Sequence, residues 1–263
     1  MGEHMRFDGK VVVITGGFPE LGEATARLFA QRGAAGIVLG GRNVERGHAI
    51  AAIMTAAGCT SHFVPADLAN LDDCAAVLGA ADQAFGRIDV LINNLGVIDS
   101  STLWETSPET FDNIFAINVR APFFFMQRAA AIMKRERIPG TVINIISLSC
   151  QKEPPLIPAY HASEGALASM IQSVGLALLN DGISVFGLNV GWPGSELDAS
   201  DRLEFALDWS GRTAGCARTP QEAAQAIALL ASTQAGVDSG SIVDFNGDPT
   251  GEWQASPSRP AMV

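Results

Sequence analysis

Cysteine and histidine are scarce and scattered in this sequence. The four cysteines form no CxxC pair, and the four histidines show no HExxH or comparable ligand spacing. Neither a disulfide framework nor a structural metal site is therefore indicated. Scattered cysteines of this kind are typical of a reducing environment, so we expect a cytoplasmic location.

Positive charge is also sparse. Acidic residues outnumber basic ones by 28 to 17, which gives a formal net charge of −11. Nucleic acids and anionic membranes bind surfaces with clustered Lys and Arg. Neither is therefore expected as a partner, and the acidic excess is typical of a solvated surface.

Long apolar runs are missing as well. The first ten residues, MGEHMRFDGK, contain no apolar stretch of signal-peptide length. Residues 165–180 carry no charge, but this stretch is short for a membrane span and contains Ser, Gln and Asn. We expect a buried helix there, and no membrane-spanning segment.

Short β-branched segments alternate with longer helical segments along the whole chain. The 263 residues, 48% of them hydrophobic, suffice for one large α/β domain over 1–263. Nearly continuous apolar segments such as VVVIT suit strands buried on both faces of a parallel sheet, and the alternation predicts a doubly wound sheet. We expect strands at residues 11–15, 36–39, 62–64, 90–93, 141–147, 184–189 and 241–245, and helices at 21–31, 44–57, 71–85, 108–137, 159–180 and 220–231.

Residues 193–217 break this alternation. They follow an expected strand end, which is where ligands bind in such sheets, and this placement indicates a lid or specificity insert. A solvated surface excursion is the alternative that the sequence leaves open.

The first expected strand runs directly into TGGFPELG, residues 15–22, and then into a helix. Glycines at such a turn let backbone N–H groups approach a pyrophosphate, and the helix N-terminus adds positive potential. This turn resembles the TGxxxGxG phosphate loop of the short-chain dehydrogenase/reductase family. Thr15, Gly16 and Gly22 match the loop and are implied to bind the cofactor.

Glu20 stands where that family has its middle glycine. Two interpretations remain open. The Glu20 carboxylate either faces the pyrophosphate and repels it, or turns outward and stabilises the helix dipole.

Further matches to the family follow in order along the chain, and they imply a single Rossmann-type domain with about seven strands. Asp67 and Leu68 match the family's adenine-contacting positions, and Asn94 and Gly96 lie in a segment similar to its NNAG motif. Asn118 matches its mid-helix Asn, and Ser147 and Tyr160 are thirteen positions apart, as in the family. Gly191 and Ser195 lie in a segment similar to the one that holds the carboxamide, and residues 243–247 resemble the last strand.

The end of the second expected strand bears on the choice of cofactor. An acidic side chain there would bind the adenosine ribose and repel a 2′-phosphate. Here Gly41 leaves room for a phosphate and Arg42 supplies a guanidinium, so NADP is favoured over NAD. The alternative is that Arg42 only caps the strand end in water.

The resemblance also implies the catalytic groups. The Ser147 hydroxyl holds the carbonyl oxygen, the Tyr160 hydroxyl gives or takes the proton, and Asn118 anchors a water. In the family's YxxxK motif the lysine lowers the pKa of the tyrosine and donates to the nicotinamide ribose. In this sequence the lysine position is Glu164, and His161 and Lys152 are the candidate replacement cations.

The change of sign at residue 164 has a calculable effect. A unit charge about 4.5 Å from the phenol oxygen is worth roughly 3–4 kcal/mol at an effective dielectric constant of about 20. Replacing plus by minus therefore raises the pKa of Tyr160 further above its ordinary value of about 10. Tyr160 would be a poor base for alcohol oxidation but a protonated donor for carbonyl reduction, and Glu164 could still accept hydrogen bonds from ribose hydroxyls.

Three functions follow from these residues. The first is NADP(H)-linked reduction of a small-molecule carbonyl, with the alcohol as the reverse substrate. The second is a repurposed enzyme without hydride transfer, in which Glu164 is a general base. The third is a non-catalytic subunit. The helices containing Asn118 and Tyr160 resemble those that pair between family subunits, which implies a homodimer or homotetramer.

Overall fold

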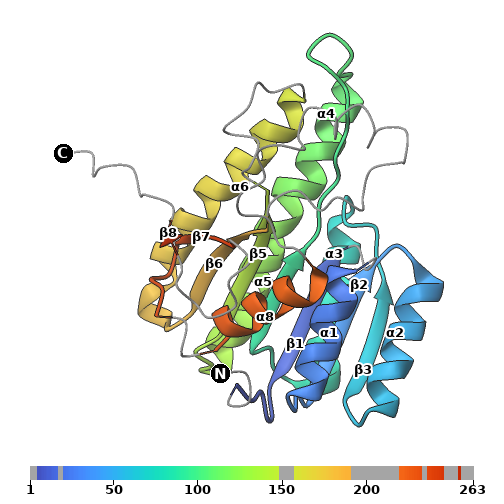
Figure 1. The fold of residues 1–263 in the computed structure, drawn as a ribbon, viewed down its shortest axis with the longest axis vertical. Coiled ribbons are helices and arrows are strands. Elements are labelled where there is room, and N and C mark those ends of the chain that lie inside the picture. Colours follow the sequence, from blue (N-terminus) through green and yellow to red (C-terminus); the bar gives the residue numbers. More distant parts are fainter. Residues whose placement is uncertain are drawn as a thin grey trace.

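The eight strands form one sheet in the order β3-β2-β1-β4-β5-β6-β7-β8 (Figure 1). The computed structural model describes residues 5–16, 20–147, 157–190, 219–232, 236–245 and 254–255. The strands are β1 (Val11–Gly16), β2 (Gly36–Gly41), β3 (Thr60–Pro65), β4 (Val90–Asn94), β5 (Thr141–Ile146), β6 (Ser184–Asn189), β7 (Ile242–Asp244) and β8 (Gln254–Ala255).

Strands β1 to β7 are parallel, which confirms the predicted doubly wound fold. Strand β8 pairs antiparallel with β7 and was not expected from the sequence, because two residues are too few to show a strand pattern. Strand β1 lies between β2 and β4. The chain therefore winds outward in both directions from β1, and the carboxyl ends of β1 and β4 lie at the reversal of strand order, which is where ligands bind in open sheets of this kind.

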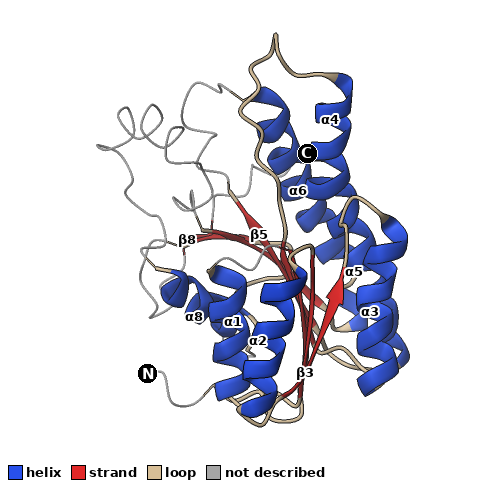
Figure 2. Cartoon of the chain, turned by 90° about the vertical axis from the view of Figure 1, so that its right-hand side faces the viewer, coloured by secondary structure: helices blue, strands red, loops and turns tan. Residues whose placement is uncertain are grey.

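Helices cover both faces of the sheet (Figure 2). Helices α1, α2 and α8 lie on one face, and α3, α5 and α6 lie on the other. Their bounds are α1 (Leu21–Gln31), α2 (Val44–Ala56), α3 (Leu71–Phe85), α4 (Pro108–Phe115), α5 (Ala121–Arg135), α6 (Pro158–Ala177) and α8 (Pro220–Leu230), with a 3₁₀ turn η3 (Leu179–Asp181) after α6.

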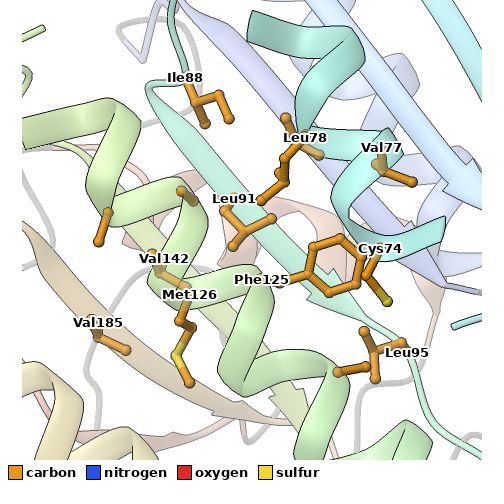
Figure 3. Packing of buried hydrophobic residues seen from close by; sticks show 14 of the residues in the cluster. Cys74, Val77, Leu78, Ile88, Leu91, Leu95, Phe125, Met126, Val142 and Val185 are labelled. Atoms are coloured by element: carbon orange, nitrogen blue, oxygen red, sulfur yellow. The ribbon is translucent and has the colours of Figure 1, made fainter. Parts of the chain in front are cut away.

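Each layer of helices packs on its own apolar cluster. Strand side chains alternate between the two faces, so Val13 and Leu91 join the cluster beneath α3 and α5, whereas Val12 and Ile92 join the one beneath α1 and α8. Figure 3 shows the first cluster, in which Phe125 of α5 packs between the sheet and α3. The predicted burial on both faces is confirmed for β1, β2 and β4, whereas β3 is partly exposed.

The helix expected at residues 108–137 is not α-helical throughout. Helix α4 passes through a π-helical turn, η1 (Ala116–Arg120), before α5 begins. Pro122 has no N–H to give the carbonyl of Asn118 four residues earlier, so the regular hydrogen-bond ladder cannot continue there. Residues 108–135 are helical throughout, as expected, but the π-helical turn was not predicted, and Pro122 was the signal for it.

No helix in the described ranges combines the length and the apolar character needed to cross a bilayer.

Candidate active site

The predicted cofactor and catalytic residues follow the carboxyl ends of five neighbouring strands. Because neighbouring strands are about 4.8 Å apart, the edge from β3 to β5 spans roughly 19 Å, which suits an extended dinucleotide. In sheet order the residues are Asp67 and Leu68 after β3, Arg42 after β2, Thr15 and Gly16 at the end of β1, Asn94 and Gly96 at and after the end of β4, and Ser147 after β5.

Gly16 occupies the most crowded point of this edge. It pairs in register with Asn94 and has a φ of +102°. A Cβ at this position would overlap the backbone carbonyl of Asn94, so any other residue would force β1 and β4 apart. Glycine is therefore required here by the packing of the two strand ends as well as by the predicted approach of a pyrophosphate.

The start of α1, like that of α6, has no side-chain capping hydrogen bond among the described residues. Glu20 is the N-cap residue and is exposed, and its side chain makes no capping hydrogen bond. Gly22 is buried in the first turn. The first N–H groups of α1 therefore keep donor capacity for a phosphate. By contrast, α2, α3, α4 and α8 are capped by the side chains of Asn43, Asn70, Ser107 and Thr219.

Two charged groups lie toward the predicted adenine end. Arg42 is exposed directly after β2 and makes no ion pair within the described part of the chain. Asp67 is exposed after β3, and its carboxylate accepts the backbone N–H of Ala69 at 3.1 Å, while Leu68 is buried beside it. The Arg42 guanidinium is thus available to an anionic ligand.

Buried amides link the strands just below this edge. The Thr15 hydroxyl donates to Oδ1 of Asn93 at 3.2 Å, and Nδ2 of Asn93 donates to Oδ1 of Asn144 at 2.8 Å. Asn144 donates in turn to the carbonyl of Phe186 at 3.3 Å. The contact between Asn93 and Asn144 was not predicted, although an amide inside an otherwise apolar strand is a visible signal of a buried hydrogen bond.

Asn118 lies in the π-helical turn η1 and is 1% exposed. Its amide forms reciprocal hydrogen bonds with Val97, accepting from the Val97 N–H at 2.8 Å and donating to the Val97 carbonyl at 3.0 Å. It also donates to Oγ of Ser163 at 3.0 Å, and Ser163 donates to the carbonyl of Tyr160 at 2.7 Å. Asn118 therefore connects the segment after β4 to the turn of α6 that carries Tyr160, through a serine that the sequence analysis missed.

Tyr160 and Glu164 lie one turn apart on α6, which places them on the same face of the helix. Both are buried, with exposed fractions of 5% and 6%. The Oε2 atom of Glu164 accepts a hydrogen bond from the backbone N–H of Ser147 at 2.7 Å. The structure thus brings the end of β5 against the α6 turn that holds the predicted proton donor.

Burial dominates the electrostatics of Glu164. Loss of hydration raises the pKa of its carboxyl from 4.5 to about 7, although the Ser147 N–H opposes this shift. Near neutral pH the group is therefore a mixture of carboxylate and carboxylic acid. The negative charge expected from the sequence at residue 164 is therefore fully present only above this pKa.

Of the two candidate replacement cations, the structure describes His161. Burial lowers the pKa of His161, and its Nδ1 atom has no hydrogen-bond partner among the described residues. Lys152, Gly191, Ser195 and the expected insert at 193–217 lie outside the described residues.

Comparison with known proteins agrees with this arrangement. The family model described as short chain dehydrogenase matches residues 10–204. The chain belongs to the short-chain dehydrogenase family. This short-chain dehydrogenase is 34% identical to a sorbitol dehydrogenase of Cereibacter sphaeroides over 219 residues, which cover 81% of this chain and 84% of the relative. It is 30% identical to a cyclopentanol dehydrogenase of Comamonas sp. over 248 residues, covering 93% and 98%.

Solved structures share the fold. A short chain dehydrogenase/reductase family protein superposes with a TM-score of 0.77 at 31% identity, covering 92% of this chain and 98% of that one. A short-chain type dehydrogenase/reductase from Mycobacterium marinum gives a TM-score of 0.81 at 23% identity, covering 94% and 97%.

Membership of the family makes this chain an oxidoreductase that uses a nicotinamide dinucleotide. The described residues fit such a group at three points. The start of α1 has no side-chain cap, the Arg42 guanidinium is unpaired within the described ranges, and the predicted cofactor residues lie where the strand order reverses. Glu164 fits the nicotinamide ribose less well, because its Oε2 atom already accepts the Ser147 N–H.

Proposed function

We propose that this short-chain dehydrogenase reduces a small-molecule carbonyl with NADPH, and that proton transfer depends on Tyr160 without an adjacent lysine. The observation that carries the proposal is the burial of Tyr160 one turn from a carboxyl group, with the end of β5 bonded to that same carboxyl. An acidic neighbour disfavours tyrosinate, so Tyr160 remains in the protonated form that a reduction requires.

The roles of the side chains follow from their chemistry. The Ser147 hydroxyl holds the carbonyl oxygen of the substrate, and the Tyr160 hydroxyl donates the proton to that oxygen. A bound nicotinamide supplies the hydride. Asn118 fixes the α6 turn of Tyr160 through Ser163, and in our proposal it also anchors the water implied by the family.

The weak point of this site is oxidation. Alcohol oxidation needs Tyr160 as a base, and an ionised Glu164 carboxylate disfavours the tyrosinate that such a base forms. Because the pKa of Glu164 is about 7, the penalty on tyrosinate grows as the pH rises through neutrality. We therefore propose that reduction is the favoured direction.

The cofactor preference rests on Arg42. Its guanidinium is exposed at the end of β2 and has no carboxylate partner within the described ranges. A planar guanidinium binds a phosphate through two parallel hydrogen bonds, which supports NADP over NAD.

The substrate class and the assembly belong to the same proposal. The relatives named as sorbitol and cyclopentanol dehydrogenases act on small alcohols by their names, and we propose a small carbonyl or alcohol here. Phe123 and Phe124 of α5 and Leu176 of α6 are exposed. A second subunit packed on α5 and α6 would cover these side chains, which supports a homodimer or homotetramer. We propose a cytoplasmic location for this assembly.

Calorimetric titration of NADPH and NADH into the wild type and Arg42→Ala tests the cofactor. Wild type is expected to bind NADPH more tightly, and Arg42→Ala to weaken NADPH binding roughly tenfold to a hundredfold while leaving NADH unchanged. Arg128→Ala removes an exposed arginine from α5 and is the control. Absence of NADPH binding up to millimolar concentration would refute the proposal, and equal loss of both cofactors would refute the role of Arg42.

A further inference from the structure

We propose that Glu164 is a positioning residue for Ser147, whose carboxyl fixes the end of β5 against α6 by accepting the Ser147 backbone N–H. This inference rests on the proposed function in one respect, namely that the Ser147 hydroxyl holds the substrate carbonyl. It assigns Glu164 a structural task within the site, in place of contact with the cofactor or proton abstraction from the substrate.

The first step concerns the backbone of Ser147. The ladder between β4 and β5 ends at the pair Asn93 and Asn144, and β5 itself ends at Ile146. The Ser147 N–H therefore lies beyond the sheet, yet the residue is only 5% exposed. A buried N–H needs an acceptor. Oε2 of Glu164, at 2.7 Å, is that acceptor.

The second step concerns α6. At residue 163 the helix is bonded through Asn118 to Val97 after β4, and at residue 164 it is bonded to Ser147 after β5. Two consecutive residues thus fasten one turn of α6 to the ends of two neighbouring strands. Tyr160 lies on that same turn, with its carbonyl bonded to Ser163. The position of Ser147 relative to Tyr160 is set by this pair of attachments.

The third step concerns residue type. A lysine ammonium carries donors only and could not accept the Ser147 N–H. Glutamine presents a carbonyl oxygen at the same distance along the side chain, so it can replace Glu164 as the acceptor without its charge. Leucine fills a similar volume and offers no acceptor. Variants with glutamine, leucine or lysine at position 164 therefore distinguish the effect of the hydrogen-bond acceptor from the effect of the negative charge.

The test is amide hydrogen exchange at Ser147, measured by NMR on the full chain of wild type, Glu164→Gln, Glu164→Leu and Glu164→Lys. Exchange in Glu164→Gln is expected within about threefold of wild type, whereas in the Leu and Lys variants it speeds up roughly tenfold to a hundredfold. Glu136→Gln and Glu136→Leu are the controls, because Glu136 is exposed at the end of α5. Unchanged exchange in Glu164→Leu would overturn the proposal.

Steady-state reduction of a carbonyl with NADPH is the second readout. Glu164→Leu is expected to lower kcat at least tenfold with little change in the KM for NADPH, and Glu164→Gln to restore most of kcat. If Glu164→Gln loses activity as completely as Glu164→Leu while Ser147 stays protected, the carboxylate acts chemically and the positioning role is wrong. Glu164→Lys is expected to gain no oxidation activity, because it leaves the Ser147 N–H without an acceptor.

The two proposals fail in different ways. Amide exchange at Ser147 is measured without cofactor or substrate. If the variants show the expected exchange rates but the wild type reduces no carbonyl, only the proposed function is refuted. An active wild type with unaltered exchange in Glu164→Leu would refute only the positioning role. If Glu164→Leu does not fold, Glu164→Asp takes its place, because its shorter carboxylate cannot reach Ser147 without moving α6, and exchange at Ser147 is again expected to speed up.

Discussion

The backbone N–H of Ser147 donates to the side chain of Glu164 across 2.7 Å, from the end of β5 to the second turn of α6. The family to which this chain belongs is expected to carry a lysine at residue 164. Here a buried carboxyl bonds to the protein itself, and within the described part of the chain it forms no ion pair. The pKa of the Glu164 carboxyl is therefore set by its burial and by the hydrogen bond from the Ser147 N–H.

The stability of the fold is expected to depend on pH through Glu164. The folded-state pKa is about 7 against 4.5 for the exposed group, so between these values the folded protein holds a proton that the unfolded chain releases. The contribution to the free energy of unfolding is full below pH 4.5 and declines by about 3 kcal/mol as the pH rises through about 7, at roughly 1.4 kcal/mol per pKa unit. Urea denaturation across this range measures the decline.

Glu164→Gln should remove this component of the pH dependence, and Glu136→Gln should keep it. Comparing these two variants with the wild type separates the titration of Glu164 from that of the carboxylates common to all three proteins. A Glu164→Gln variant with the same pH slope as wild type would contradict the raised pKa.

Tyr160 offers an unusually direct measurement, because it is the only tyrosine in the sequence. Tyr160→Phe is expected to lower kcat for carbonyl reduction roughly a hundredfold to ten-thousandfold and to change NADPH affinity by less than about threefold. In the wild type the tyrosinate absorbance reports this one residue. Retention of activity in Tyr160→Phe would show that the proton comes from another group.

Gly16→Ala is expected to destabilise the protein by more than about 3 kcal/mol, because the new methyl group would overlap the Asn94 carbonyl at a backbone φ of +102°. Gly58→Ala is a matched control, since Gly58 has a φ of +89° but open space around a Cβ. It should cost only the backbone strain, about 1 kcal/mol. Equal losses in the two variants, measured by denaturant unfolding, would rule out crowding between β1 and β4.

Asn118→Ala is expected to cost about 2–4 kcal/mol of stability, because it leaves both backbone groups of Val97 and the Ser163 hydroxyl without their amide partner. Asn113→Ala, at an exposed position of α4, should change stability by less than about 0.5 kcal/mol. Chemical denaturation compares the two, and similar values would mean that the Asn118 bonds contribute nothing beyond solvation.

Much of the fold could be predicted from the chain. The bounds of α1, α3 and β6 agree with the expectation, because apolar periodicity and clear end signals coincide there. The π-helical turn η1 was missed because the apolar pattern continues through it, although Pro122 marked it. Strand β8 could not be predicted, since two residues are too few to show a strand pattern.

The sequence by itself determined the alternation of strands and helices, the family, and the placement of an acid one turn after Tyr160, because these are properties of local order and spacing. Only the tertiary structure decided what that acid touches. Burial of Glu164 and its bond to Ser147 arise where the end of β5 meets α6. Residues 147 and 164 meet there through packing between elements, and hydration lost in that contact sets the charge state of the site.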